Sequence, residues 1–434
     1  MNDSPLNPQQ KKLRIAIIGG GVCGLVCAVT LMKVGVDVQL YEASAKFGEV
    51  GAGVGLGPNA IRVLEQLGLL DEVVAKSDQA KPETRPFHIA SGYGDNELIY
   101  DYPVKPEDVG LGIHRVAFLD AISQFVDLSK THFNKRCVSL NHSKNKSEIM
   151  IQFSDGTSAT ADVVLGADGV RSVVRTYVTE GAEGYTTPGR FVRTSYTNTL
   201  AYRGLVPDSK VVELGMKTVM NKTPICWVGL DKHIITFPIK GATLINVVAF
   251  VTDRSKPPSL DPLPQPWVTQ HSTETLLTTF SDFGADPLTL LGCIESPSAW
   301  AIHSTHPLLD SYASGRVALM GDAAHAMLPH LGAGAGQGLE DAFVLVKLLS
   351  HSETTSANVE SVLQAYSMVR RPRGNFVLEA SARNGDIYEM RGQSGGTMEG
   401  MRKDLPGIWD FWYHDLEEDY NKAIQWLQEK QVFA

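Results

Sequence analysis

The segment that restricts the fold most is LRIAIIGGGVCGLVCAVTLMKVGVDVQLYEA, which extends from Leu13 to Ala43. Its apolar start at 13–18 predicts a buried strand, the stretch 25–33 predicts a helix, and 36–41 predicts a second strand. Parallel strands need a long crossover connection, and a helix of this length supplies one. The segment therefore predicts a βαβ unit and an α/β fold.

Three glycines between the first strand and the helix carry the chemistry of this unit. Gly19, Gly21 and Gly24 form GxGxxG: the first permits a tight turn, the second lets the backbone approach a pyrophosphate, and the third lets helix and strand pack closely. The helix N-terminus favours an anion. Glu42 ends the second strand about 20 residues later, where an acid accepts a hydrogen bond from a ribose hydroxyl. The unit predicts a Rossmann-like site for NAD or FAD, because the acid disfavours a 2′-phosphate.

Three further segments favour a flat, phosphorylated ligand. GEVGAGVGLGPNAIRVLEQLGL contains a glycine loop and a predicted helix at 59–67 that carries Arg62, and DVVLGADGVRSVVR is a buried strand that ends in Asp168 and Gly169. GDAAHAMLPHLGAGAGQGLED begins with a strand end and Asp322 and then repeats glycine. Because each ordered glycine costs backbone entropy, this density indicates a ligand lying against the main chain.

Together these segments resemble the fingerprints of the flavoprotein aromatic hydroxylases, the group that contains p-hydroxybenzoate hydroxylase, from about residue 13 to 373. The resemblance implies non-covalent FAD, with NADH or NADPH and O2 as co-substrates. It implies that Asp168 and Gly169 support FAD and the nicotinamide donor, and that Asp322 binds the flavin-side ribose. Arg115 in GIHRVAFLDAI would approach the FAD phosphates, with a structural ion pair as the alternative.

The glycine-rich run would pass beside the isoalloxazine ring. Gly334 and Gly336 would offer backbone amides near the pyrimidine edge, where the N-terminus of the following helix favours negative charge. Arg62 is a further cofactor-binding candidate, and a solvated surface charge is its alternative.

Five segments resemble one branch of this family, the salicylate hydroxylases: YEASAKFGEVGAGVGLGPNAIR, AYRGLV, GLDKHIITFPI, INVVAFVTDRS and GDAAHAMLPHLGAGAGQGLEDA. The branch implies conversion of salicylate to catechol and CO2 through a flavin C4a-hydroperoxide. A non-decarboxylating hydroxylase of another hydroxybenzoate or of a pyridine acid is the alternative. A flavin dehydrogenase without oxygenation, or an FAD-binding module, is the alternative of a different class.

The hydroxylation requires a base for the phenol and a cation for the carboxylate. His325, three residues after Asp322, is the predicted base, with a turn-capping role as its alternative and His330 as its rival. Arg254 in FVTDRS is the predicted carboxylate anchor, because a guanidinium fork matches a carboxylate. A surface ion pair with the neighbouring acid is its alternative. Arg203 in AYRGL is the rival anchor, and His233 is a further candidate for substrate contact.

The remaining pattern predicts the domain order. Residues 1–185 and 300–375 would form two parts of the FAD-binding domain, and 186–299, rich in strand-like runs, would form an inserted antiparallel-sheet substrate domain. Residues 376–434 would form a C-terminal helical segment whose aromatic side chains serve packing more than cofactor contact.

Composition limits the partners. A net charge of −9 without a basic run disfavours nucleic acid, and the apolar stretch at 15–32 is interrupted by glycines, which argues against export or a membrane span. Five cysteines without a CxxC pattern predict small buried thiols, no metal site and a reducing, cytoplasmic location. A monomer or a homodimer is expected.

Overall fold

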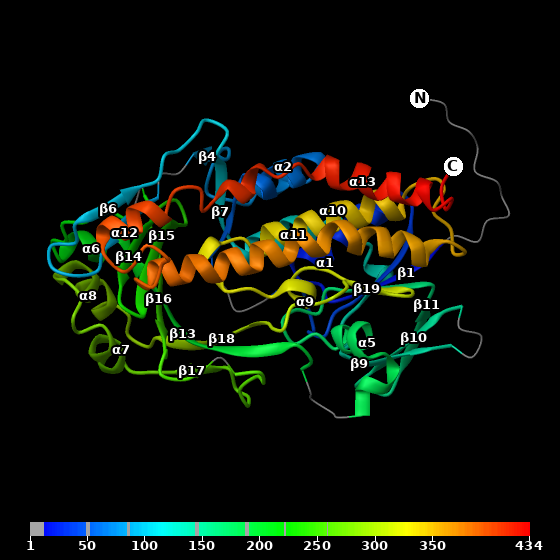
Figure 1. Ribbon diagram of the computed structural model, residues 1–434, viewed down its shortest axis with the longest axis horizontal. Coiled ribbons are helices and arrows are strands. Elements are labelled where there is room, and N and C mark those ends of the chain that lie inside the picture. The colour runs from blue at the N-terminus through cyan, green and yellow to red at the C-terminus, as the bar shows by residue number, and fades with distance from the viewer. Residues whose placement is uncertain are drawn as a thin grey trace.

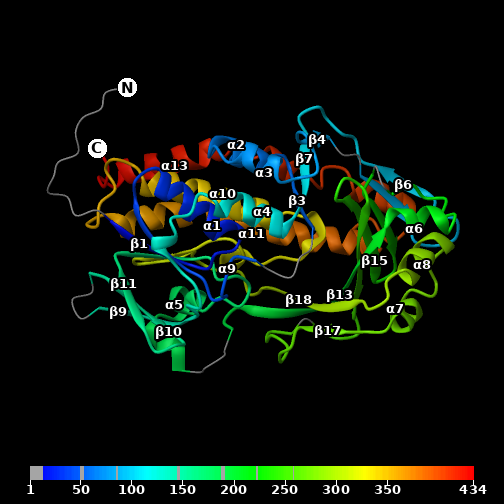
Figure 2. The ribbon, with the colours of Figure 1, turned by 180° about the vertical axis from the view of Figure 1, so that it is seen from behind.

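The computed structural model describes residues 13–48, 53–84, 87–143, 147–186, 191–220, 223–257 and 259–434. The molecule is elongated, with one sheet near each end of its long axis (Figure 1). Helices α10 and α11 extend along this axis and link the two ends, as the reverse view in Figure 2 also shows. The mixed α/β fold agrees with the fold class predicted from the sequence.

The first sheet has six strands in the order β19-β20-β12-β1-β2-β8. Its strands are β1 (Arg14–Ile18), β2 (Asp37–Tyr41), β8 (Thr131–His132), β12 (Val163–Gly166), β19 (Ala313–Ser314) and β20 (Val317–Leu319). All pairings are parallel except β19–β20. Helix α1 (Val22–Lys33) connects β1 to β2, so the predicted βαβ unit is present, and its strand and helix cores are buried.

The second sheet has eight strands in the order β17-β18-β13-β16-β15-β14-β5-β6. These strands are β5 (His88–Ser91), β6 (Leu98–Asp101), β13 (Thr194–Pro207), β14 (Ile225–Gly229), β15 (Lys232–Ile239), β16 (Leu244–Thr252), β17 (Val268–Gln270) and β18 (Ser298–Thr305). The predicted insertion at 186–299 is therefore too narrow as a structural unit: β5 and β6 come from the first part of the chain, and β18 crosses the boundary.

The register of the second sheet assigns side chains to its two faces. Ala201 pairs with Phe250 and Phe250 with His233, while Arg203 pairs with Val248 and Val248 with Ile235. Because side chains alternate along a strand, all of these share one face. The other face packs its apolar side chains against α7 (Thr273–Thr279) and α8 (Ala285–Gly292).

Smaller elements complete the fold. Two three-stranded sheets contain β9 (Cys137–His142), β10 (Ile149–Phe153) and β11 (Ser158–Ala161), and β3 (Gly53–Leu56), β4 (Glu83–Thr84) and β7 (Val109–His114). The other helices are α2 (Pro58–Gln66), α3 (Leu70–Ala75), α4 (Arg115–Ser123), α5 (Val174–Glu180), α6 (Asp208–Glu213), α9 (Asp322–His325), α10 (Gly334–Leu349), α11 (Val359–Tyr388), α12 (Met398–Asp404) and α13 (Leu416–Glu429). Short 3-10 turns are η1 (Leu128–Lys130), η2 (Ala182–Thr186), η3 (Pro329–Leu331) and η4 (Asp410–Tyr413).

Helix α11 crosses the boundary that the sequence suggested at 375/376. It has 30 residues and continues through Pro372, so the second cofactor-domain part and the C-terminal segment share one helix. Its contacts include β19 and β20 of the first sheet and β14 of the second.

A buried ionic cluster joins α10 to α11. The guanidinium of Arg370 contacts Glu340 at 2.9 Å, Asp341 at 2.9 Å and Asp419 at 3.3 Å, and its side chain is fully buried. The second carboxylate oxygen of Asp341 accepts hydrogen bonds from Gly321 N at 2.9 Å and His325 Nε2 at 2.6 Å. The cluster therefore fixes the turn after β20 to both long helices.

Removal of the Arg370 guanidinium is expected to destabilise the fold. Arg370→Ala leaves buried carboxylates without their cation, and breaking a buried pair costs about 3–5 kcal/mol. We expect a loss of that size in the free energy of unfolding, measured by urea denaturation of the apoprotein. The matched control is Arg383→Ala, on the exposed side of the same helix. Similar losses in both variants would contradict this reading.

Candidate active site

The turn between β1 and α1 has the geometry that its glycines predict. A Cβ on Gly19 would lie 2.3 Å from the carbonyl oxygen of Ala167, and one on Gly24 would lie 2.0 Å from that of Gly19. A Cβ on Gly21 would meet only Arg115 Nη2, at 3.9 Å. Gly19 and Gly24 are thus required for packing, whereas the backbone at Gly21 faces open space.

This open space is a cleft of about 110 Å³ where the sequence motifs converge. Its lining comes from the β1–α1 turn, the segment after β12, the turn after β20, the glycine run and Arg115: Gly21, Val22, Cys23, Val54, Arg115, Ala167, Gly169, Met320, Gly321, Asp322, Gly334 and Ala335. Segments far apart in the sequence therefore meet at one site. Exposed backbone at a helix N-terminus, a guanidinium and an acid fit a dinucleotide with its phosphates at Gly21.

Glu42 lies beside the glycine turn. Its Oε2 accepts a hydrogen bond from Gly20 N at 2.7 Å, and its Oε1 accepts one from Ser44 N at 2.7 Å. The carboxylate is thus oriented by backbone at the carboxyl end of β2. Each oxygen retains a lone pair for a hydroxyl donor.

The acids of the DG and GD segments have different surroundings. Asp168 is half-buried and accepts hydrogen bonds from Ser172 Oγ at 2.5 Å and from two backbone N–H groups at the start of α5. Burial raises the pKa of Asp168 despite these bonds. Asp322 is exposed to the cleft, and its Oδ1 lies 3.8 Å from the position of a Cβ on Gly334. Asp168 therefore shapes the turn, whereas Asp322 is free to meet a ligand.

Two predicted cofactor residues lie apart from the cleft lining. Arg62 donates from Nη2 to the carbonyl oxygen of Trp412 and lines a separate groove with Glu340 and His414. Gly336 faces Asn59, whose Nδ2 would lie 3.0 Å from an added Cβ. For Arg62 the contact favours a structural role over the predicted cofactor contact, because its guanidinium points to the C-terminal segment.

An apolar cavity of about 250 Å³ lies at the other end of the glycine run. It is lined by Gly55, Leu56, Gly57, Pro58, Phe87, Asp108, Gly110, Leu111, Gly112, Pro224, Ile235, Phe237, Pro329, His330, Leu331, Gly332, Trp409 and Trp412. Ile235 and Phe237 belong to the sheet face that carries His233. Since an apolar cavity of about 150 Å³ can hold benzene, this one suits a single substituted ring.

His330 is the imidazole of this cavity. It belongs to η3, is 4% exposed, and its ring centroid lies 5.0 Å from that of His233 and 5.2 Å from that of Phe250. Burial, and then the proximity of His233, lower the pKa of His330 to about 3. The ring is therefore neutral near pH 7, and it is a weaker base than an ordinary imidazole.

His325, the base that the sequence favoured, occupies a different place. It is fully buried, its Nε2 lies 2.6 Å from Asp341 Oδ2, and it does not line the apolar cavity. The first turn after Asp322 points inward, because the Asp341 carboxylate takes both Gly321 N and the imidazole. The arrangement favours the turn-holding alternative for His325.

The predicted anchor Arg254 is held by carboxylates. Its Nη2 lies 2.8 Å from Asp386 and 2.5 Å from Glu389. Neither is the neighbouring acid Asp253 that the alternative to the anchor role had named. Arg203 lies on the sheet face shared with His233 and Ile235, 5.0 Å from the Trp300 ring. Burial, and then the positive charge of Arg115, lower the pKa of Arg203.

The C-terminal aromatic residues have a role beyond the packing that the sequence predicted. Trp409 and Trp412 stack at 5.1 Å and pack as expected, but they also form one wall of the apolar cavity. An added Cβ on Gly57 would lie 2.6 Å from Trp412 Nε1, so the glycine loop before α2 must lack a side chain there. The density of aromatics in WDFWY was the available signal, but packing alone explained it equally well.

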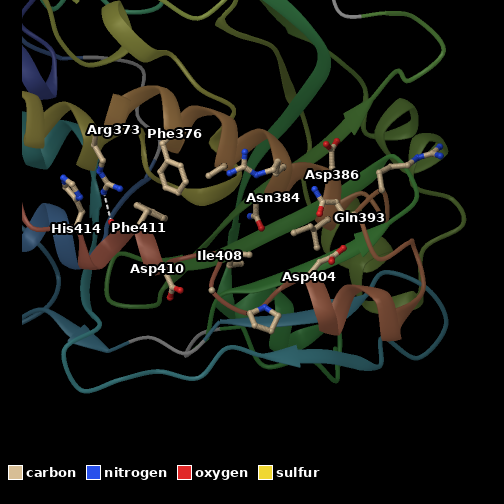
Figure 3. Close-up of a pocket in the computed structure, with 17 residues that line it drawn as sticks. Arg373, Phe376, Asn384, Asp386, Gln393, Asp404, Ile408, Asp410, Phe411 and His414 are labelled. Atoms are coloured by element: carbon tan, nitrogen blue, oxygen red, sulfur yellow. Dashed lines mark hydrogen bonds between the residues drawn. The ribbon is translucent and has the colours of Figure 1, made fainter. Parts of the chain in front are cut away.

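A larger cavity of about 540 Å³ lies between α11 and the segment 391–414 (Figure 3). Its charges are largely used internally: Arg373 donates to the carbonyl oxygen of Phe411 at 2.6 Å, and Arg391 pairs with Asp231 at 2.8 Å. Asn384, near the centre of Figure 3, donates to the carbonyl oxygen of His330 at 3.0 Å. This cavity therefore lies behind the turn that carries His330.

Comparison with known proteins identifies the family to which this chain is similar. Residues 12–381 match the FAD binding domain family. A salicylate hydroxylase of Pseudomonas putida is 37% identical over 418 residues, which cover 95% of this chain and 94% of the relative. A 6-methylsalicylate 1-monooxygenase of Aspergillus terreus is 31% identical over 432 residues, covering 95% and 92%.

Among solved structures, a salicylate hydroxylase substrate complex superposes with a TM-score of 0.83 and 34% identity, covering 95% of this chain and 98% of the other. Within the described ranges, no helix has the length and apolar character needed to cross a membrane.

The opening at Gly21 generates a test of the cofactor cleft. Gly21→Ala places a methyl group where the backbone must approach a pyrophosphate, and the loss of a charged hydrogen bond should lower FAD affinity by about one to two decades. FAD release measured by flavin fluorescence checks this, with Gly292→Ala at an uncrowded helix position as control. Unchanged FAD affinity in Gly21→Ala would show that the FAD phosphates do not bind at this turn.

Proposed function

The chain belongs to the family of FAD-binding monooxygenases that includes the salicylate hydroxylases, and we propose that it hydroxylates a single-ring phenolic carboxylic acid such as salicylate. The observation that carries the proposal is the apolar cavity at the glycine run, with the neutral imidazole of His330 in its wall. We propose NADH as the electron donor, O2 as the co-substrate, and catechol and CO2 as products.

The residues of the cleft fit FAD. Gly21 and Arg115 would face its phosphates, Glu42 and Asp322 would accept hydrogen bonds from its hydroxyl groups, and Gly334 would admit the ring system against the main chain. Helix α10 begins at Gly334, so its N-terminal dipole favours negative charge on the bound ring. Bound FAD supplies electron transfer from the nicotinamide donor and activation of O2.

The chain must then prepare the substrate. A phenol ring becomes more nucleophilic as its hydroxyl proton leaves. An imidazole can accept that proton where a nearby carboxylate raises its basicity, as Glu389 does for His330. His330 is placed for this role by the cavity wall. The apolar lining excludes water, which strengthens each electrostatic contact with a substrate anion.

The substrate carboxylate requires a cation, and two arginines are candidates. The positive charge of Arg254 helps to lower the pKa of His330. However, Arg254 is already paired with two acids. Arg203 shares a face of the second sheet with Ile235, which lines the cavity, although neither arginine is in the cavity lining itself. We propose Arg254 as the anchor, acting through the side of its guanidinium away from Glu389, and Arg203 as the alternative.

The overall reaction is tested with a panel of hydroxylated benzoates and pyridine acids. Purified protein loaded with FAD is given NADH and O2, and product mass and CO2 release are measured for each acid. Catechol and CO2 from salicylate support decarboxylating hydroxylation. A product that retains the carboxyl group favours the non-decarboxylating alternative, and NADH oxidation without any oxygenated product favours a dehydrogenase.

Single replacements of the two histidines distinguish the catalytic base from the histidine that holds the turn. His330→Ala is expected to keep FAD and to oxidise NADH with substrate, but to lose product, because a general base contributes on the order of 10²–10⁴ in the assisted step. Catechol per NADH should fall, H2O2 should rise, and higher pH should restore part of the yield. His325→Gln should mainly lower stability. Full coupling in His330→Ala together with uncoupling in His325→Gln would restore the original assignment.

The KM values for a carboxylic acid and for a neutral phenol show which arginine binds the substrate carboxylate. Replacement of the true anchor by Gln removes a charged hydrogen bond, so KM for the acid should rise by about one to two decades. KM for the neutral phenol should change much less. Arg254→Gln and Arg203→Gln are measured side by side. Equal effects on both substrates in both variants would show that neither arginine binds the carboxylate.

A further inference from the structure

Glu389 is a buried acid that no sequence motif singled out. It follows the last residue of α11 and is 1% exposed. Its Oε1 accepts a hydrogen bond from Thr252 Oγ1 at 2.7 Å, and its Oε2 accepts one from Arg254 Nη2 at 2.5 Å. The carboxylate is thus inserted at the end of β16 in a fixed orientation.

The same carboxylate faces a row of two imidazoles. Nδ1 of His233 lies 3.6 Å from Glu389 Oε1, just beyond hydrogen-bond length. His233 is fully buried and is stacked on Phe250 at 4.6 Å, and its ring lies next to that of His330. His330 in turn lines the apolar cavity. A continuous row therefore connects Glu389 to the proposed substrate cavity.

The charges around Glu389 explain why it stays ionised inside the protein. Burial opposes the charge, but His233, His330 and Arg254 together lower the pKa of Glu389 to about 2. Outside this group, Asp386 contacts Arg254, and Arg391 pairs with Asp231, which lies 3.9 Å from Arg254. Glu389 is accordingly the buried negative charge that faces both imidazoles.

We propose that Glu389 is a positioning residue of the hydroxylation site, which orients His233 and Arg254 and stabilises the positive charge that appears when His330 accepts the substrate's hydroxyl proton. The inference rests on the proposed function. In this step the substrate O–H bond breaks and an N–H bond forms on His330. The resulting imidazolium lies beside His233, whose Nδ1 faces the Glu389 carboxylate. Loss of that carboxylate would leave the new charge without a buried counter-ion.

The chain offers a matched pair of variants. Glu389→Gln keeps the shape of the side chain and removes its charge, whereas Asp386→Asn removes the same charge from the exposed side of the same guanidinium nitrogen. Within the described part of the chain, Asp386 pairs with Arg254 and makes no ion pair or hydrogen bond with either imidazole. A specific effect of Glu389 can therefore be separated from a general loss of negative charge near Arg254.

We expect Glu389→Gln to lower catechol per NADH by about tenfold or more, the usual size of effect when a carboxylate that orients an imidazole is lost. The yield should recover as pH rises, because the substrate hydroxyl then ionises without help. Glu389→Asp should restore part of it, and Asp386→Asn should change it by less than about twofold. FAD affinity should remain that of wild type in all three, which a purely structural defect would not allow.

The outcomes separate the two proposals. If the wild-type holoenzyme oxygenates no acid of the panel, the proposed function fails. If it oxygenates salicylate but Glu389→Gln and Asp386→Asn show the same yield and the same pH profile, the inference about Glu389 is overturned. Should Glu389→Gln not fold, Thr252→Val loosens the same carboxylate, and an unchanged pH profile in that variant overturns the inference equally.

Discussion

The buried pairing of Asp341 with Arg370 is the interaction on which both halves of the site depend. One carboxylate holds a guanidinium from α11, the backbone of the turn after β20, and His325. Burial of such a charge is costly unless it is fully paired, so the three elements cannot separate independently. Asp322 and the start of the glycine run are consequently fixed relative to the helix that also supports the substrate side.

Local patterns predicted the cofactor half well, because its chemistry is concentrated in short segments. Gly19 and Gly24 have the packing roles that their spacing indicated, and Asp322 and Gly334 line the same cleft. Arg62 and Gly336 instead face Trp412 and Asn59. The βαβ order also followed from apolar runs alone. These features depend on contacts within or directly after single strands, which sequence spacing records.

The substrate half depends on contacts between segments that are distant in the sequence. The roles and partners of its residues were therefore harder to predict. Two histidines five positions apart could not be ranked by spacing, because the inward direction of His325 is set by Asp341 on another helix. Arg254 was predicted to bind a substrate carboxylate, and its contact with Glu389 was not foreseen, because β16 ends against the end of a helix far away in the sequence. Strands β5 and β6 join the second sheet through pairings that no local pattern encodes.

The single long helix α11 sets a constraint on how this chain can vary. Arg370 in its first half anchors the cofactor turn, Ser381 and Asn384 hydrogen-bond the backbone of η3, and Glu389 follows its end. At 1.5 Å and about 100° per residue, the helix fixes these side chains over about 28 Å with a defined angular phase. An insertion or deletion of one residue within it would turn the distal contacts away from the substrate while the cofactor contacts stayed in place. The helix thus fixes the distance between the cofactor contacts and the substrate contacts. Point substitutions can change individual contacts, whereas a change in helix length would separate the two sets.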